Sequence, residues 1–91
     1  MKDNLDNWRK QIDDIDEDLI TLLAKRVVII RKIGTFKKKH KISPLDKKRW
    51  EDILSLQLKK SEKLGLTQEF VKDVLNLIHK YSLKIQENSN G

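Results

Sequence analysis

Residues 5–37 read LDNWRKQIDDIDEDLITLLAKRVVIIRKIGTFK, and apolar side chains recur along them at alternating steps of three and four. The positions on this repeat, here called the apolar seam, are Leu5, Trp8, Ile12, Ile15, Leu19, Leu22, Arg26, Ile29, Ile33 and Phe36. Nine of the ten are apolar, which is typical of a long amphipathic helix that packs against another helix. The repeat therefore predicts a helix over about residues 5–38.

Arg26 is the one charged residue on the apolar seam. Because burial of an unpaired guanidinium is costly, we expect an anion to meet it. Arg9 and Lys37 flank the same seam four heptads apart, or about 42 Å along a straight helix, so one chain cannot bring both to one small ligand. Each of these two residues, taken alone, also fits a solvated surface charge.

Two chains can bring these cations together. If two copies of the helix pack antiparallel about residue 20 or 21, Arg9 of one chain lies level with residues 26–37 of the other. We therefore expect an intertwined antiparallel helical homodimer with two equivalent cationic pockets.

The rest of the chain predicts two further helices. Ser43 is a plausible N-cap with Pro44 at the first helical position, which starts a second helix at about 44–63, and Gly65 is a signal for its end. Asp46 then has a structural interpretation as part of a capping box. A third helix follows at about 67–87, with a polar tail at 88–91. The fold class is thus all-α, with one long, one short and one medium helix in a single domain, 1–91.

Polar residues lie in line with, or at the edge of, the apolar stripes of these two helices. Arg49 and Trp50 stand at the N-terminal end of the second stripe, and Ser82 and Gln86 follow Ile78 on the third. Uncharged groups in such positions can hydrogen-bond a buried ligand. The alternative for Ser82 and Gln86 is a helix end that frays into water.

Composition limits the class of protein. With 91 residues, 37% apolar and 37% charged, a lone chain cannot bury a large core, and dimerisation would supply part of one. The chain has no cysteine, which excludes disulfides and thiolate chemistry. No apolar run approaches the ~18 residues of a membrane span, and the N-terminus lacks a secretory signal. We expect a soluble, cytoplasmic protein with no membrane partner.

Charge raises two further hypotheses. The net charge of +6 suggests nucleic acid, but only five residues are aromatic and no nucleic-acid-binding motif occurs. Binding of nucleic acid is kept as a lesser alternative to a solvated or substrate-steering face. The acidic residues at 13–18 resemble a metal site, yet most of them fall on the outer face of the helix. We expect no metal.

The parts of the sequence that match a known family are Leu5 to Gln11, Arg26, Lys37, Asp46 to Arg49 and Ser82 to Gln86. Together they closely resemble the all-helical (type II) class of chorismate mutases. The resemblance covers about residues 5–86. It implies an intertwined dimer whose two sites each take an arginine from the partner's first helix. It also implies the Claisen rearrangement of chorismate to prephenate in the shikimate pathway, with no metal, nucleophile or redox cofactor.

The resemblance implies roles for individual residues. Arg9 of the partner chain, Arg26 and Arg49 match arginines that hold the two carboxylates of the substrate. Lys37 and Gln86 match the pair on the ether oxygen, Ser82 a hydroxyl near a carboxylate, and Asp46 a position that helps receive the ring hydroxyl.

Trp50 departs from the family pattern, because chorismate mutases usually carry a glutamate there that contacts the ring hydroxyl. Trp50 is either a core residue or part of a reshaped wall around the ring substituent. Three alternatives follow: an isochorismate pyruvate lyase, a mutase acting on an amino analogue of chorismate, and a weakly active module that depends on a pathway enzyme as partner.

Overall fold

Three helices and no strand make up residues 2–88, the part of the chain that the computed structural model describes. They are α1 (Lys2–Lys39), α2 (Lys47–Lys63) and α3 (Gln68–Glu87). The expected all-α class, with one long, one short and one medium helix, is confirmed. Of the polar tail expected at 88–91, residues 89–91 lie outside the described residues. No described helix combines the length and the apolar character that a membrane span requires.

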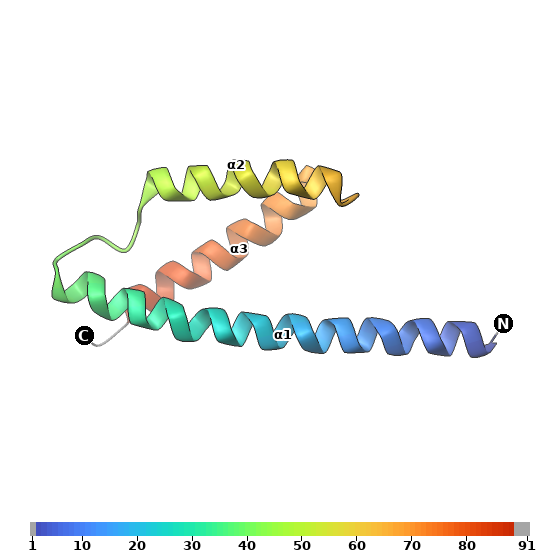
Figure 1. Cartoon of the computed structure of the whole chain (residues 1–91). Helices are drawn as coiled ribbons and strands as arrows, with labels where there is room; N and C mark the ends of the chain where they lie inside the picture. Colours follow the sequence, from blue (N-terminus) through green and yellow to red (C-terminus); the bar gives the residue numbers. More distant parts are fainter. Residues whose placement is uncertain (1, 89–91) are drawn as a thin grey trace.

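α3 holds the other two helices together (Figure 1). It packs against both α1 and α2, whereas no packing between α1 and α2 is found within residues 2–88. The molecule measures 58 × 27 × 14 Å, and the N-terminal end of α1 extends well past α2 and α3 (Figure 1). This end of α1 therefore has no neighbour within the chain as described.

The apolar seam is uncovered. No apolar side chain is buried among residues 4–88, where the buried residues are Gly34, Ser61, Ser82 and Gln86. All nine apolar residues of the seam are exposed, from 38% at Ile33 to 62% at Leu22. An exposed apolar stripe of this length is typical of an interaction surface.

α2 begins at Lys47, later than the expected start at about 44, and the expected N-cap at Ser43 is wrong. Asp46 is the N-cap, and its carboxylate accepts a hydrogen bond from the backbone N–H of Arg49 at 3.1 Å. Pro44 stays in the connecting loop, where its carbonyl accepts a hydrogen bond from the ammonium of Lys37 at 2.7 Å. This contact with α1 holds the loop outside the helix. The carboxylate of Asp46, three residues after Ser43, caps the helix instead.

Positive φ angles mark the ends of α1 and α2. Gly65 (φ 81°) follows α2 and confirms the expected end signal, and Thr67 then caps α3. Lys41 (φ 57°) has the same position after α1, where the N–H of Ile42 reaches back to the carbonyl of Lys37 at 2.7 Å. A lysine in this left-handed conformation is strained, since its Cβ crowds the following carbonyl.

Candidate active site

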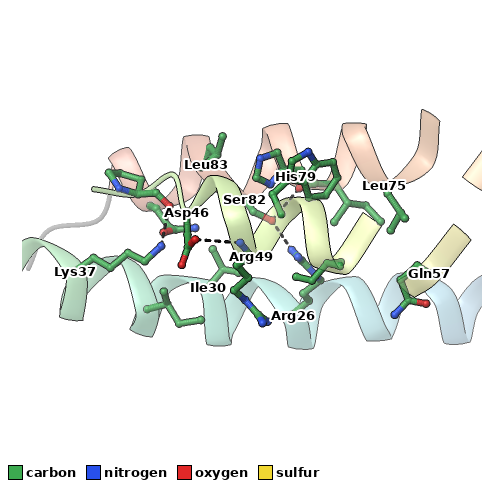
Figure 2. Close-up of a pocket in the computed structure, with 16 residues that line it drawn as sticks. Arg26, Ile30, Lys37, Asp46, Arg49, Gln57, Leu75, His79, Ser82 and Leu83 are labelled. Carbon is green, nitrogen blue, oxygen red and sulfur yellow. Dashed lines mark hydrogen bonds between the residues drawn. The ribbon is translucent and has the colours of Figure 1, made fainter. Parts of the chain in front are cut away.

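A cavity of about 280 Å³ is lined by side chains from all three helices and from the loop before α2 (Figure 2). Its size suits a small metabolite. Seven of the eight site residues predicted from the sequence line it: Arg26, Lys37, Asp46, Arg49, Trp50, Ser82 and Gln86. The helices thus bring together residues that are up to 60 positions apart in the chain.

Arg26 spans from α1 to α3. Its guanidinium donates a hydrogen bond to the Ser82 hydroxyl, which in turn donates to the carbonyl of Ile78 at 2.8 Å (Figure 2). Burial, and secondly the like charge of Arg49, lower the pKa of Arg26 from its ordinary value. The expected anion is not found among the described residues, where the partner of this guanidinium is a neutral hydroxyl.

The pocket has an excess of positive charge. Arg26, Lys37 and Arg49 line it together with one carboxylate, Asp46. None of the three cations forms an ion pair within the described part of the chain, and Asp46 accepts from a backbone N–H. Three cations and one carboxylate leave an excess of two positive charges for a ligand. Planar guanidinium groups pair well with carboxylates.

Gln86 places a buried amide in the same pocket. Its side chain is 6% exposed, and its Oε1 has no hydrogen-bond partner among the described residues. A buried amide oxygen without a partner is destabilising, so such groups in native proteins usually serve a ligand or water. The amide also carries two N–H donors that a ligand oxygen can use.

His79 is a pocket residue that the sequence interpretation missed. Its imidazole lies flat against the indole of Trp50, with ring centroids 3.9 Å apart and an interplanar angle of 8°. Both rings line the cavity and are half-buried. The spacing of three and seven residues from His79 to Ser82 and Gln86 could have revealed that all three share one helix face.

Aliphatic side chains complete the wall of the cavity. They are Ile30, Ile33, Ile53, Leu75, Ile78 and Leu83. Gln57 is a further polar residue of the lining that was not predicted. An apolar wall beside a few convergent polar groups is typical of a site that binds a small organic molecule.

Arg9 is the predicted site residue that the chain does not bring to the pocket. It is exposed on α1, 17 positions before Arg26 and so about 26 Å from it along the helix axis. Its place is the end of α1 that extends past the other helices (Figure 1).

The acidic residues at 13–18 are all exposed on α1. No group of three or more histidine, aspartate or glutamate side chains arranged to hold a metal ion occurs in the described residues.

These features define an all-α protein with a partly apolar pocket that carries an excess of cationic side chains. Comparison with known proteins narrows the class. The family described as chorismate mutase type II matches residues 8–87, and the chain belongs to this family of isomerases. The expected family is therefore confirmed.

Curated relatives include two T-proteins. That of Enterobacter agglomerans is 31% identical over 83 residues, which cover 91% of this chain and 22% of the relative. That of Haemophilus influenzae is 31% identical over 71 residues, which cover 78% of this chain and 19% of the relative. The chain thus spans about a fifth of the length of these relatives. No solved structure gave a significant match.

Proposed function

We propose that the chain catalyses the rearrangement of chorismate to prephenate, in aromatic amino-acid biosynthesis in the cytoplasm. One observation carries the proposal: Arg26, Lys37 and Arg49 line one small cavity without an ion-pair partner among the described residues. Chorismate is a compact dicarboxylate, and such an anion is what this set of cations lacks. The family match supports the same activity.

Binding of the two carboxylates falls to the arginines. Arg26 and Arg49 present guanidinium groups that can each pair with a carboxylate through two parallel hydrogen bonds. Ser82 keeps Arg26 oriented by accepting its hydrogen bond. Because the like charges of the two arginines repel, a bound dianion relieves a repulsion present in the free protein.

Lys37 and Gln86 are proposed to act on the ether oxygen. This oxygen gains negative charge as the C–O bond breaks, so fixed donors aimed at it lower the barrier. Each such donor is worth roughly 3 to 4 kcal/mol in comparable sites. The hydrogen bond from Lys37 to the Pro44 carbonyl holds the ammonium in place, and burial holds the Gln86 amide.

The remaining lining residues select the reactive conformer. The rearrangement is pericyclic, so the enzyme needs no nucleophile and gains rate by holding the enolpyruvyl side chain over the ring. Asp46 is proposed to help receive the ring hydroxyl, and Trp50 to form part of the wall near the ring. Because the described pocket is lined by aliphatic side chains as well, it can enclose the carbocycle while the cations hold the carboxylates.

A homodimer is part of the proposal. The uncovered apolar seam supports it, because each large aliphatic side chain that leaves water contributes about 1.5–3 kcal/mol when fully buried. Antiparallel packing about residue 20 or 21 brings Arg9 level with residues 31–33 of the partner chain, between the positions of Arg26 and Lys37. Arg9 would then complete the partner's cationic pocket.

Incubation of the purified chain with chorismate, isochorismate and the amino analogue, each alone, tests the activity. Prephenate from chorismate is the expected product. Pyruvate from isochorismate alone would move the function to the lyase, and turnover of the amino analogue alone would move it to that substrate.

Absence of any product would favour a binding role that depends on a pathway enzyme. Salt-sensitive retention on nucleic acid, unaffected by a chorismate analogue, would instead favour the nucleic-acid alternative.

A further inference from the structure

Two stacked rings form one part of the pocket wall. The indole of Trp50 on α2 and the imidazole of His79 on α3 lie face to face at 3.9 Å. In Figure 2, His79 lies beside Ser82, whereas Asp46 lies nearer to Lys37. A ring held flat against an indole cannot tilt without losing that contact, so the stack fixes the plane in which the imidazole nitrogens lie.

The imidazole offers this wall both a donor and an acceptor. Burial, and secondly the charge of Arg26, lower the pKa of His79 from its ordinary value, so the ring is neutral at neutral pH. A neutral imidazole has one N–H donor and one acceptor nitrogen, whereas the indole of Trp50 has a donor only. No hydrogen bond of the His79 side chain is found within residues 2–88.

A hydroxyl on the substrate ring needs such a partner. A hydroxyl both donates and accepts, and enclosing it without a hydrogen bond is costly. The cations are assigned to the carboxylates and the ether oxygen, and one oxygen of Asp46 is engaged in capping α2. The imidazole of His79 lines the same cavity, and its donor and acceptor are not assigned to any other group of the substrate.

We infer that His79 hydrogen-bonds the ring hydroxyl of chorismate and that Trp50 positions it, which makes His79 a specificity-determining residue. The inference rests on the proposed function, since it assigns a partner to one group of that substrate.

The test compares kcat/KM for chorismate and for the analogue that lacks the ring hydroxyl. Wild type should prefer chorismate by about tenfold or more, because one buried hydrogen bond separates the two substrates. His79→Phe keeps a flat ring against Trp50 but removes both nitrogens. Its preference for chorismate should fall well below that of wild type, to the part that Asp46 supplies, while its kcat/KM for the analogue stays at the wild-type level.

Further variants separate hydrogen bonding from folding. His79→Gln, which retains a donor and an acceptor, should keep part of the preference even if His79→Phe does not fold. Trp50→Leu should lower the preference and Trp50→Phe restore it, as expected of a positioning residue. His40→Phe is the matched control, because the ring of His40 contacts Phe36, with centroids 4.2 Å apart, and does not line the pocket.

If wild type is active and a folded His79→Phe variant prefers chorismate over the analogue as strongly as wild type does, the inference is overturned. The proposed function then still stands. If wild type does not convert chorismate at all, the proposed function fails and the inference fails with it. The first arm uses no variant, so the two failures are distinguishable.

Discussion

The guanidinium of Arg26 donates a hydrogen bond to the hydroxyl of Ser82, which joins α1 to α3 at the edge of the cationic pocket. Both residues are predicted to act on the substrate, so this contact links helix packing to the site. Ser82 is 4% exposed and its hydroxyl also donates to its own helix, so its position is fixed before any ligand binds.

Ser82→Ala should lower both stability and activity. Loss of the acceptor removes a hydrogen bond to a charged group, which at this partly buried position is worth about 1 kcal/mol, and it frees Arg26 to move. We expect about a tenfold loss in kcat/KM and a matching small loss in the free energy of unfolding. Chemical denaturation and initial-rate kinetics measure the two effects.

Ser61→Ala is the matched control for Ser82→Ala. Ser61 is also 4% exposed and its hydroxyl also bonds within its own helix, to the carbonyl of Leu58 at 2.7 Å, but it does not line the pocket. It should lose stability without losing activity. Equal losses of activity in the two variants would contradict a role for Ser82 at the site.

Gln86→Leu should stabilise the free protein and nearly abolish activity. The substitution removes a buried oxygen that has no partner among the described residues, and such a group costs about 1–3 kcal/mol. It also removes a donor to the ether oxygen, worth about 10²–10³ in kcat. Thermal denaturation and kcat measure the two effects, and a variant that is both less stable and fully active would refute this assignment of Gln86.

Stability should fall in acid through His79. Its pKa is lowered from 6.5 in the folded protein, by burial and then by Arg26, so the unfolded chain takes up the proton first as the pH falls. The contribution of His79 to stability is thus complete above 6.5 and is lost as the pH drops below it towards the lowered pKa. The other charged groups that line the pocket are Arg26 and Lys37 of α1, Arg49 of α2 and Asp46 before α2.

Free energies of unfolding measured between about pH 7 and about pH 5 test this prediction. His79→Phe should show a shallower decline than wild type, and His40→Phe should decline like wild type. A wild-type slope in His79→Phe would show that other groups cause the acid sensitivity.

Lys41→Gly should stabilise the protein by up to about 1 kcal/mol, because glycine adopts positive φ without the crowding that a Cβ causes. Gly65 already fills the equivalent position after α2. Lys41 does not line the pocket, so activity should stay at the wild-type level. Denaturant titration checks the stability, and a loss of stability would contradict the strain assigned to this residue.

Helical periodicity made much of the site predictable. A fixed number of residues per turn places Ser82 and Gln86 on one face of α3, and the apolar seam marks the face of α1 that carries Arg26. Lys37 flanks the seam and Arg49 stands at the edge of the second stripe, and the family resemblance then assigned roles to these otherwise common residues. Their meeting in one cavity agrees with that pattern.

Other features depend on contacts between distant residues, which periodicity does not encode. Two competing caps, Ser43 and Asp46, precede α2, and the hydrogen bond from Lys37 to the loop favours the later one. His79 shares a helix face with Ser82 and Gln86, but its stacking on Trp50 of α2 is a contact between two helices that periodicity does not encode.

The shared active site is the central claim, and mixing two inactive variants tests it most directly. Arg9→Ala and Lys37→Ala are each expected to fold, to dimerise and to be nearly inactive towards chorismate. In a mixed dimer, one pocket has an intact Lys37 and receives an intact Arg9 from the partner. Unfolding the two variants together and refolding them should therefore restore prephenate formation to about a quarter of the wild-type rate per chain. If refolded wild type is active but the refolded mixture forms no prephenate, the result would contradict a site completed across the dimer.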